Sequence, residues 1–415
     1  MQRLDSKKIC RYAFALGVIL LATVLDVALD DRHKNMLLVA YICLSPLILL
    51  IRECRVILPR IDVPMLVFSV FAGISGAVWH PEHFRLGTYL FSVGFCVYFA
   101  MMARMLRVAR FTVDEFLKLL RIIIYAFTIV LLIQQFCVLT GLPVFNQTTV
   151  YGEPWKLDSL AREPSYMVTI LSILIFFFSL ISKAGHPDQN LLYNIRKNPW
   201  TWICYLWCLF TCYTASAYVA LPLSLIPWID RRNLVRSIGI LVAVITACLI
   251  INNFIPSRQF SRTQRTVAAL VTLDSAKIVE ADLSASERII PAMTIMKKLH
   301  VSDADFWLGH GSDKAMKDVK PTPLETETSP YIFNVWYNYG FLAELGLLWL
   351  IFNVCLIIRK PITWIVSAAA FIYIAYNNCS AIWMILIFMM QYRVSVNPAS
   401  PLLKPLHQAD ILRRS

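Results

Sequence analysis

The residue types that could carry chemistry gather in two polar stretches of an otherwise apolar chain. In the first, Arg162, Glu163 and Ser165 stand immediately before a long apolar run. The second, residues 256–330, contains several arginines and a Gly-His-Gly turn at 309–311. Arginine binds anions through paired hydrogen bonds, and a carboxylate or an imidazole can accept a proton. Such residues are typical of a site that binds an anion and deprotonates a hydroxyl.

The histidine of this turn competes with Glu163 for the role of proton acceptor. Gly309 and Gly311 flank His310, and glycines let a substrate approach the backbone closely. A loop histidine beside a tight turn is the purely structural alternative. For Glu163 the structural alternative is a position among lipid headgroups beside Arg162, because charged groups at a membrane boundary are costly unless they are paired or used.

Residues 285–300 predict an amphipathic helix inside the second stretch. Apolar side chains recur with the helical period at Ile289, Met293, Met296 and Leu299. Proline is tolerated only in the first turn of a helix, so the predicted helix should begin only shortly before Pro291. Arg288 then lies at or just before the helix entrance, where free N–H groups bind phosphate-like anions. We therefore predict Arg288 as an anion ligand, with Arg265 behind it.

The composition is that of an integral membrane protein. Of 415 residues, 58% are hydrophobic and 16% charged, and the mean hydropathy is +0.62. A soluble domain is about 45–50% apolar and about 25% charged. The formal net charge of +13 could indicate nucleic acid binding, but in a membrane protein excess Lys and Arg mark cytoplasmic loops. No nucleic acid partner is predicted.

The apolar runs predict an all-α, polytopic membrane helix bundle of about twelve spans with one large extracytoplasmic loop. The predicted spans are 11–29, 36–51, 63–79, 87–106, 117–140, 165–182, 199–213, 215–229, 236–255, 332–357, 361–376 and 379–392. The boundaries near 213–215 and 376–379 are the least defined. The chain then divides into 1–255 (first part of the bundle), the loop 256–330, 331–392 (last part) and the tail 393–415.

The distribution of Lys and Arg predicts the orientation. With twelve spans, the side that holds both termini carries 24 Lys and Arg, and the opposite side carries five outside the long loop. Positive charge marks the cytoplasm, and long loops escape this rule. Both termini are therefore predicted to be cytoplasmic, and 141–164 and 256–330 to lie outside. The long loop has ten basic and ten acidic residues, which is not the composition of a basic lipid-binding surface.

No metal, cofactor or disulfide framework is predicted. The polar loops 141–163 and 256–330 contain no cysteine. Cysteines at 204, 208 and 212 follow a helical period without a neighbouring His or carboxylate, as expected of helix-packing residues. His80, Glu82 and His83 on a short outer loop have no evident supporting ligand set, so we expect them to contact headgroups.

The order of these motifs resembles the bacterial O-antigen polymerase and ligase superfamily, which includes the exopolysaccharide polymerases. The matching elements are the Arg-Glu-Pro-Ser stretch at 162–165, the serine-arginine stretch at 284–288, the turn at 309–311 and the segment from Ser329 through Asn334 into a Gly-Leu-containing helix. The resemblance covers residues 155–358. The family's histidine before that helix falls on Ser329, and its arginine after span seven is absent from Ser216-Ala217. The missing histidine favours a polymerase over a ligase, because the polymerases of this superfamily vary more at that position.

The resemblance implies a glycosyltransferase on the outer face of the bacterial inner membrane. Such an enzyme moves a glycan from an undecaprenyl-pyrophosphate carrier to a sugar hydroxyl on another lipid-linked repeat. A chain-length regulator and a flippase are the expected partners, beside the substrate and the bilayer. The alternatives are an O-antigen ligase of the same superfamily and a flippase or transporter for lipid-linked oligosaccharides. We find no internal repeat of the kind that transporters carry.

The implied roles fall to the residues already named. The pyrophosphate ligands are Arg288, Arg162 and Arg265, because arginines neutralise phosphates through two-point contacts. Glu163 and His310 are the proton acceptors, and Glu163 is favoured because the polyprenyl tail holds the reacting bond near the bilayer. The remaining substrate-binding residues are Ser165, Gly309, Gly311 and Asn334.

Overall fold

A computed structural model of the chain is helical, with no strand among the residues that it describes. These residues are 5–24, 35–147, 154–212, 214, 216–229, 239, 246, 264–266, 268–269, 271–272, 274–281, 283–312, 314–318, 333–374, 380–397 and 400–405. The predicted all-α class is confirmed for this part of the chain.

The described helices follow the apolar runs of the sequence. The α-helices are α1 (Ser6–Ala22), α2 (Met36–Leu44), α3 (Pro59–Ile74), α4 (Leu86–Ala109), α5 (Val113–Thr140), α6 (Pro164–Gly185), α7 (Leu191–Lys197), α8 (Pro199–Thr211), α9 (Ser216–Leu225), α12 (Ser275–Ala281), α13 (Leu283–Lys298), α14 (Ala304–Leu308), α15 (Lys314–Asp318), α16 (Asn334–Cys355), α17 (Pro361–Ile374) and α18 (Ser380–Val396). The short helices are η1 (Ser45–Leu50), η2 (Arg52–Cys54), η3 (Ser75–Trp79), η4 (Pro81–His83), η5 (Ile226–Trp228) and η7 (Pro401–Leu403).

Five of the described helices are long and apolar enough to cross a membrane. They are Pro59–Trp79, Leu86–Ala109, Val113–Thr140, Pro164–Gly185 and Asn334–Cys355. A helix also occupies each other predicted span except 236–255, of which the structure describes only residues 239 and 246. Several of these helices, such as Met36–Leu50, are shorter than a span requires. The chain is therefore a membrane protein by its helices, and the count of twelve spans stays a prediction.

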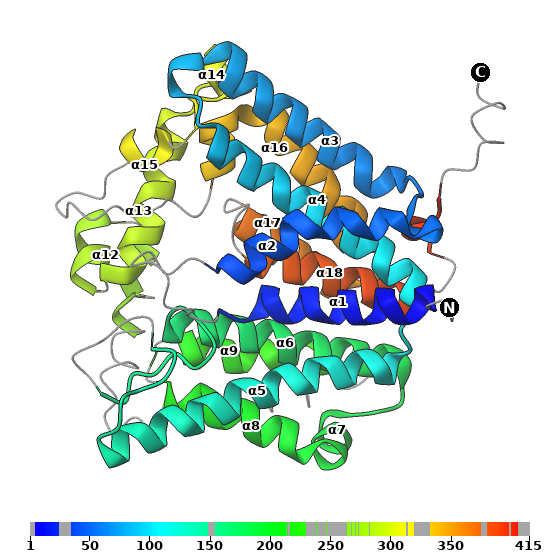
Figure 1. Ribbon diagram of the computed structural model, residues 1–415. Helices are drawn as coiled ribbons and strands as arrows, with labels where there is room; N and C mark the ends of the chain where they lie inside the picture. The colour runs from blue at the N-terminus through cyan, green and yellow to red at the C-terminus, as the bar shows by residue number, and fades with distance from the viewer. Residues whose placement is uncertain are drawn as a thin grey trace.

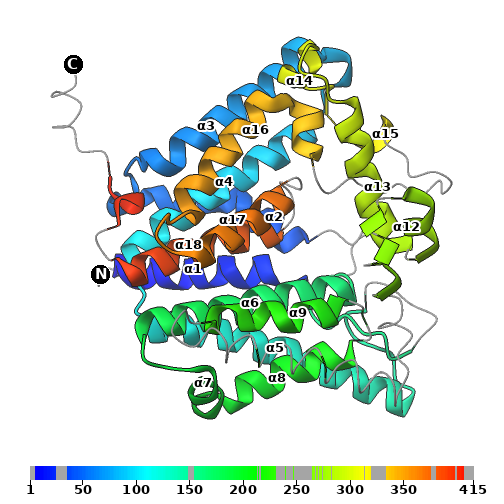
Figure 2. The same cartoon turned by 180° about the vertical axis from the view of Figure 1, so that it is seen from behind.

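The long helices lie side by side in a bundle, and the short helices of the polar segment cover one end of it. In Figures 1 and 2, α3, α4 and α16 form one edge of the bundle, and α5, α6, α8 and α9 form the other. Between these edges lie α1, α17 and α18. Helices α12–α15 stand at one end, and the first residue of α1 lies near the other end.

A buried ion pair ties α3 to α4. The guanidinium of Arg104 donates to both carboxylate oxygens of Asp62, at 2.9 and 2.8 Å, and to the carbonyl of Ala100 at 3.0 Å. The same carboxylate accepts the backbone N–H of Leu58 at 2.6 Å, just before α3 begins. Two charges at a membrane boundary are tolerated when they are paired in this way. Asp62 therefore orients the start of α3 and fixes its position beside α4.

Helices α3 and α16 pack almost backbone to backbone. A Cβ built on Gly346 of α16 would lie 2.6 Å from the nitrogen of Phe68 and 2.7 Å from the carbonyl of Pro64. Small residues at helix interfaces in membranes allow such close approach. This contact holds the middle of α16 against the first half of α3.

We expect Gly346→Ala to destabilise the protein by about 1–3 kcal/mol, the usual cost of overpacking, because backbone atoms of α3 must move. The measurement is thermal unfolding of purified protein in detergent. Gly87→Ala in α4 is the matched control, since a Cβ there meets nothing within 4 Å. Equal melting temperatures for Gly346→Ala and the wild type would contradict the close packing of these two helices.

Candidate functional site

The turn at 309–311 is attached to a break in α16. Gly340 has φ 85° and ψ 166° inside this helix, so the helical hydrogen-bond ladder is interrupted there. Two carbonyls before the break bond to the turn instead. The N–H of His310 donates to Tyr337 at 2.9 Å, and the N–H of Gly311 donates to Asn338 at 3.0 Å. The break therefore provides the acceptors that dock α14 on α16, as Figure 1 shows.

This contact requires glycines, because the two backbones lie too close together for a side chain. Gly309 has φ 85°, and a Cβ on it would lie 2.5 Å from the carbonyl of Asn338. A Cβ on Gly340 would in turn collide with the carbonyl of Trp307. Gly311 has φ 99° and packs against the side chain of His83. Side chains rarely adopt these angles, and here no space exists for one. The glycines serve protein packing, and their contact with a substrate stays a prediction.

His310 is half-buried and stacks on Tyr337, with ring centroids 3.9 Å apart and planes 5° apart. Its Nδ1 lies 3.1 Å from the carbonyl oxygen of Tyr337. A carbonyl can only accept, so Nδ1 carries the proton of this bond, and Nε2 of the neutral ring is left with the lone pair. This geometry leaves Nε2 of His310 available to accept a hydrogen bond. The same contacts with Tyr337 are also those expected of a histidine that only packs the turn against α16.

A polar cluster that the sequence did not reveal joins α14 to the short loop after α3. Oδ1 of Asp305 accepts from Nε1 of Trp79 at 2.8 Å and lies 3.2 Å from Nε2 of His80. The other ring nitrogen of His80 lies 3.1 Å from a carboxylate oxygen of Glu82. His80 thus bonds to α14, and the expected contact of His80, Glu82 and His83 with headgroups stays a prediction. Nothing local in the sequence indicates this pairing, because its partners are more than 200 positions apart.

The charge of Asp305 is stabilised in this cluster. Partial burial opposes ionisation, but the hydrogen bonds from Trp79 and His80 and the nearby His310 outweigh it and lower the pKa of Asp305. An acid with a lowered pKa stabilises the folded state above its ordinary pKa. That contribution disappears as the pH falls through the lowered value. The attachment of α14 should therefore begin to weaken as the pH falls below the ordinary carboxyl pKa.

The first predicted motif lies at the start of α6. Glu163 occupies the position before the helix, Pro164 is its first residue, and the hydroxyl of Ser165 donates to Oε2 of Glu163 at 3.3 Å. Arg162 is exposed and Glu163 is half-buried. Proline suits the first helical turn because the N–H that it lacks would have no helical partner there. The carboxylate thus has one defined partner and remains accessible.

An apolar cavity of about 360 Å³ lies along α6 below this motif. Its lining comes from α6, α9, η5, α17 and α18: Val168, Thr169, Ser172, Ile173, Phe176, Phe177, Ser216, Ala220, Leu223, Ile226, Ile365, Val366, Ala369 and Ile385. Thr169 connects the cavity to the motif, since its hydroxyl donates to the carbonyl of Ser165 at 3.0 Å. Glu163 therefore stands about one and a half helical turns from the cavity wall.

The structure does not bring the two proton acceptors together. Figures 1 and 2 place α14 beside the end of α3 and the start of α16, and the start of α6 in the other half of the bundle, with α13 between them. Glu163 and His310 therefore belong to two separate clusters. Arg265 is exposed in the polar segment, beyond α6 in the chain. Asn334 begins α16, where its side-chain oxygen accepts from Asn338 at 2.9 Å.

The predicted entrance of the helix around Arg288 is wrong. Helix α13 begins at Leu283, so Arg288 is its sixth residue and has no place among the free N–H groups of the first turn. Pro291 lies inside the helix. Tertiary packing explains the exception, because Ile290 and Ile295 on either side of the proline are buried. An anion held by Arg288 would be held by the side chain alone.

Replacing Asp305 with Asn should speed hydrogen exchange of the 304–311 amides, with a local loss of about 0.5–1 kcal/mol because the carboxylate is partly exposed. The wild type should lose the same protection below about pH 4, the ordinary carboxyl pKa, and the variant should show no such change. Exchange rates are corrected for the intrinsic rate at each pH. Asp303→Asn is the neighbouring control. Unchanged protection in Asp305→Asn would show that the contact does not hold α14.

The structure thus places most of the predicted site residues in two clusters, with Arg265 and Arg288 in the polar segment. Arg162, Glu163 and Ser165 lie together at the start of α6, and His310 lies with Asp305 over α16. No protein-family model, curated protein or solved structure matches this chain.

Proposed function

We propose that this chain is a membrane glycosyltransferase that polymerises undecaprenyl-pyrophosphate-linked oligosaccharide repeats on the outer face of a bacterial inner membrane. The observation that supports it is the placement of Glu163 above the apolar cavity along α6. A carboxylate at a helix start, an exposed Arg162 beside it and an apolar cavity within the bundle fit an amphiphile. Such a substrate has an anionic head and a long apolar tail.

The cavity would position the tail and would contribute little affinity. Lipid chains are as apolar as the cavity wall, so moving a polyprenyl chain from the bilayer into the protein gains little hydrophobic energy. The hydroxyls of Thr169, Ser172 and Ser216 give the wall a few polar points. Affinity must then come from the head, where arginines form charge-assisted hydrogen bonds with phosphate oxygens.

The proposed reaction is a displacement at the anomeric carbon of the lipid-linked donor. A hydroxyl of the acceptor repeat forms the new C–O bond, and the bond to the pyrophosphate breaks. The lipid pyrophosphate leaves with the electron pair, neutralised by Arg162, Arg288 and Arg265. The hydroxyl proton passes to Glu163. This side chain is half-buried and accepts a hydrogen bond from the hydroxyl of Ser165. The step is balanced without a metal or a redox partner.

The separation of the clusters favours Glu163 over His310 as the proton acceptor. A general base must lie within hydrogen-bond reach of the hydroxyl that it deprotonates, directly or through one water. Glu163 stands over the cavity that would hold the carrier. His310 is stacked on Tyr337 at the edge of the bundle formed by α3 and α16. We therefore assign His310 to the support of the turn and the surface around it.

One observation favours the flippase or transporter alternative. Glu344, in the span formed by α16, is only 4% exposed, and its Oε2 has no hydrogen-bond partner among the described residues. Ionisable groups buried within spans are typical of transport pathways. A flippase would move lipid-linked repeats across the bilayer without joining them. The two functions therefore differ in where single repeats accumulate when the protein fails. The ligase alternative differs in acceptor, since it would attach finished glycan to a lipid core.

We expect Glu163→Gln to nearly abolish polymer formation, because general-base assistance is worth about 10²–10⁴-fold in rate. His310→Ala should leave a shortened but measurable ladder of chain lengths. The assay is glycan laddering from cells with matched protein levels, and Glu163→Asp, which keeps the carboxylate, is the control. A normal ladder from Glu163→Gln beside none from His310→Ala would reverse the assignment. Single lipid-linked repeats retained in the inner leaflet would indicate a flippase.

Arg288→Ala should slow polymerisation roughly 150-fold or more. Two charge-assisted bonds at about 1.5–3 kcal/mol each are lost with the side chain. Arg288→Lys should recover only part of the rate, since an ammonium cannot make the planar two-point contact. Lys297→Ala, at an exposed position of the same helix, controls for a general loss of positive charge. Wild-type polymer lengths from a stably expressed Arg288→Ala protein would refute this role.

A further inference from the structure

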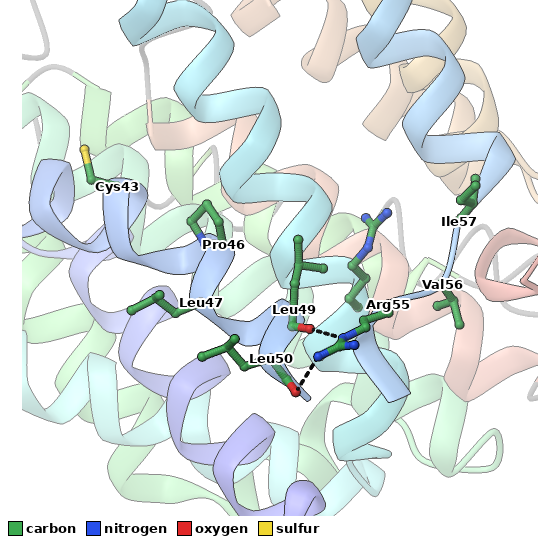
Figure 3. Close-up of a pocket in the computed structure, with 9 residues that line it drawn as sticks. Cys43, Pro46, Leu47, Leu49, Leu50, Arg55, Val56 and Ile57 are labelled. Atoms are coloured by element: carbon green, nitrogen blue, oxygen red, sulfur yellow. Dashed lines mark hydrogen bonds between the residues drawn. The ribbon is translucent and has the colours of Figure 1, made fainter. Parts of the chain in front are cut away.

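A second cavity, of about 510 Å³, opens at the end of the bundle opposite α14. It lies between η1, the segment after η2 and α4 (Figure 3). Most of its wall is apolar and includes Leu47, Leu50 and Ile57, which are all more than half exposed. Two arginines, Arg55 and Arg104, supply its charge. The cavity thus combines an apolar flank with a cationic end.

Arg55 is held at this cavity by the end of η1. Its Nε donates to the carbonyl of Leu49 at 2.7 Å, and its Nη2 lies 3.4 Å from the carbonyl of Leu50, as Figure 3 shows. These carbonyls belong to the last turn of η1, which leaves them without helical partners. The remaining Nη1 of Arg55 has no hydrogen bond to any described residue. The guanidinium is therefore held in place, and its Nη1 can still donate a hydrogen bond to a ligand.

Arg104 forms the buried part of the cationic end. This residue is 8% exposed, and its Nη atoms are taken by Asp62. Its Nε is buried and has no partner in the described part of the chain. The carboxylate of Asp62 neutralises Arg104 and also accepts a hydrogen bond from the N–H of Leu58. It therefore has little capacity left to bind a cationic ligand. The net positive charge of the cavity then comes from Arg55.

We propose that this cavity binds one anionic phospholipid, with its phosphate on Arg55 and Nε of Arg104 and an acyl chain along Leu47 and Leu50. The cavity lies at the end of the apolar helical segment Met36–Leu50. We expect phospholipid headgroups at this level because the apolar run ends there. Basic pockets between membrane helices on the cytoplasmic side bind anionic lipid heads. The lining contains no carboxylate that could receive a choline or an ethanolamine. Further positive charge lies nearby on Arg107, which bonds to the carbonyl of Glu53 at 2.9 Å.

A lipid fits this cavity better than free phosphate does. Inorganic phosphate would satisfy the two arginines and leave the apolar flank without an occupant. The exposed leucines of η1 already face the surface that the bilayer covers, so an acyl chain can lie there without leaving the membrane. The proposal concerns the end of the molecule away from Glu163 and is independent of glycan transfer.

The test uses the full-length protein purified in neutral detergent and titrated with phosphatidylglycerol, with native mass spectrometry to count bound lipid. We expect Arg55→Gln to weaken binding about tenfold or more, the value of one charge-assisted bond. Arg55→Lys should keep part of the affinity, and Arg196→Gln, an exposed arginine of α7, should keep all of it. Phosphatidylcholine, which has no net charge, should bind the wild type and Arg55→Gln with the same affinity.

Three results would overturn the proposal. They are equal binding of phosphatidylcholine and phosphatidylglycerol by the wild type, unchanged phosphatidylglycerol binding by Arg55→Gln, and full competition by millimolar inorganic phosphate. The melting temperature of each variant without lipid shows whether it is folded. If Arg55→Gln does not fold, Leu50→Ala tests the same site from its apolar flank and should also weaken binding. Polymer formation does not enter any of these measurements, so a failure here leaves the proposed function untouched.

Discussion

The crossing of two backbones at Gly309 and Gly340 is the contact on which the attachment of α14 and α15 to the bundle depends. The break in α16 leaves the carbonyls of Tyr337 and Asn338 without helical donors. The backbone N–H groups of the turn at 309–311 donate to them instead. A lipid-facing helix could not leave such carbonyls without partners, because no water is present to bond them. The polar segment is thus attached by main-chain hydrogen bonds, which depend on the absence of two side chains. Asn338 strengthens the attachment, since its side chain also accepts the N–H of Ala315 at 2.9 Å.

The same attachment explains why the end of the bundle that α12–α15 cover contains two chemically distinct clusters. Asp305 bonds to Trp79 of η3, and His310 bonds to Tyr337 of α16. Glu163 precedes α6, which packs with α9 at the other edge of the bundle and with α18 in its middle. A membrane bundle lets such sites form independently, because each span presents its end residues at the surface with little help from its neighbours. The proposed chemistry uses the cluster that adjoins an apolar cavity, and the other cluster serves to anchor the polar segment.

Paired charges define the opposite end of the bundle. Arg104 and Asp62 join α3 to α4, and Arg11 of α1 donates to Glu115 of α5 at 2.7 Å. Glu115 also completes a capping box with Thr112 at the start of α5. These pairs let arginines sit at helix ends near lipid without leaving a buried charge unpaired. Arg55 differs from them because it is held only by carbonyls, so its charge is available to a ligand.

The sequence by itself determined the helices, because a long apolar run can satisfy its backbone in a membrane only by bonding within itself. The runs at 87–106, 117–140 and 165–182 became α4, α5 and α6 with small shifts at their ends. Glu163 and Ser165 were also predictable as neighbours, since they are two positions apart. Tertiary structure alone decided the start of α13, where buried packing outweighs a proline, and the pairing of Asp305 with Trp79. It also separated His310 from Glu163. Such contacts join distant positions, and neither helical period nor local composition carries information about them.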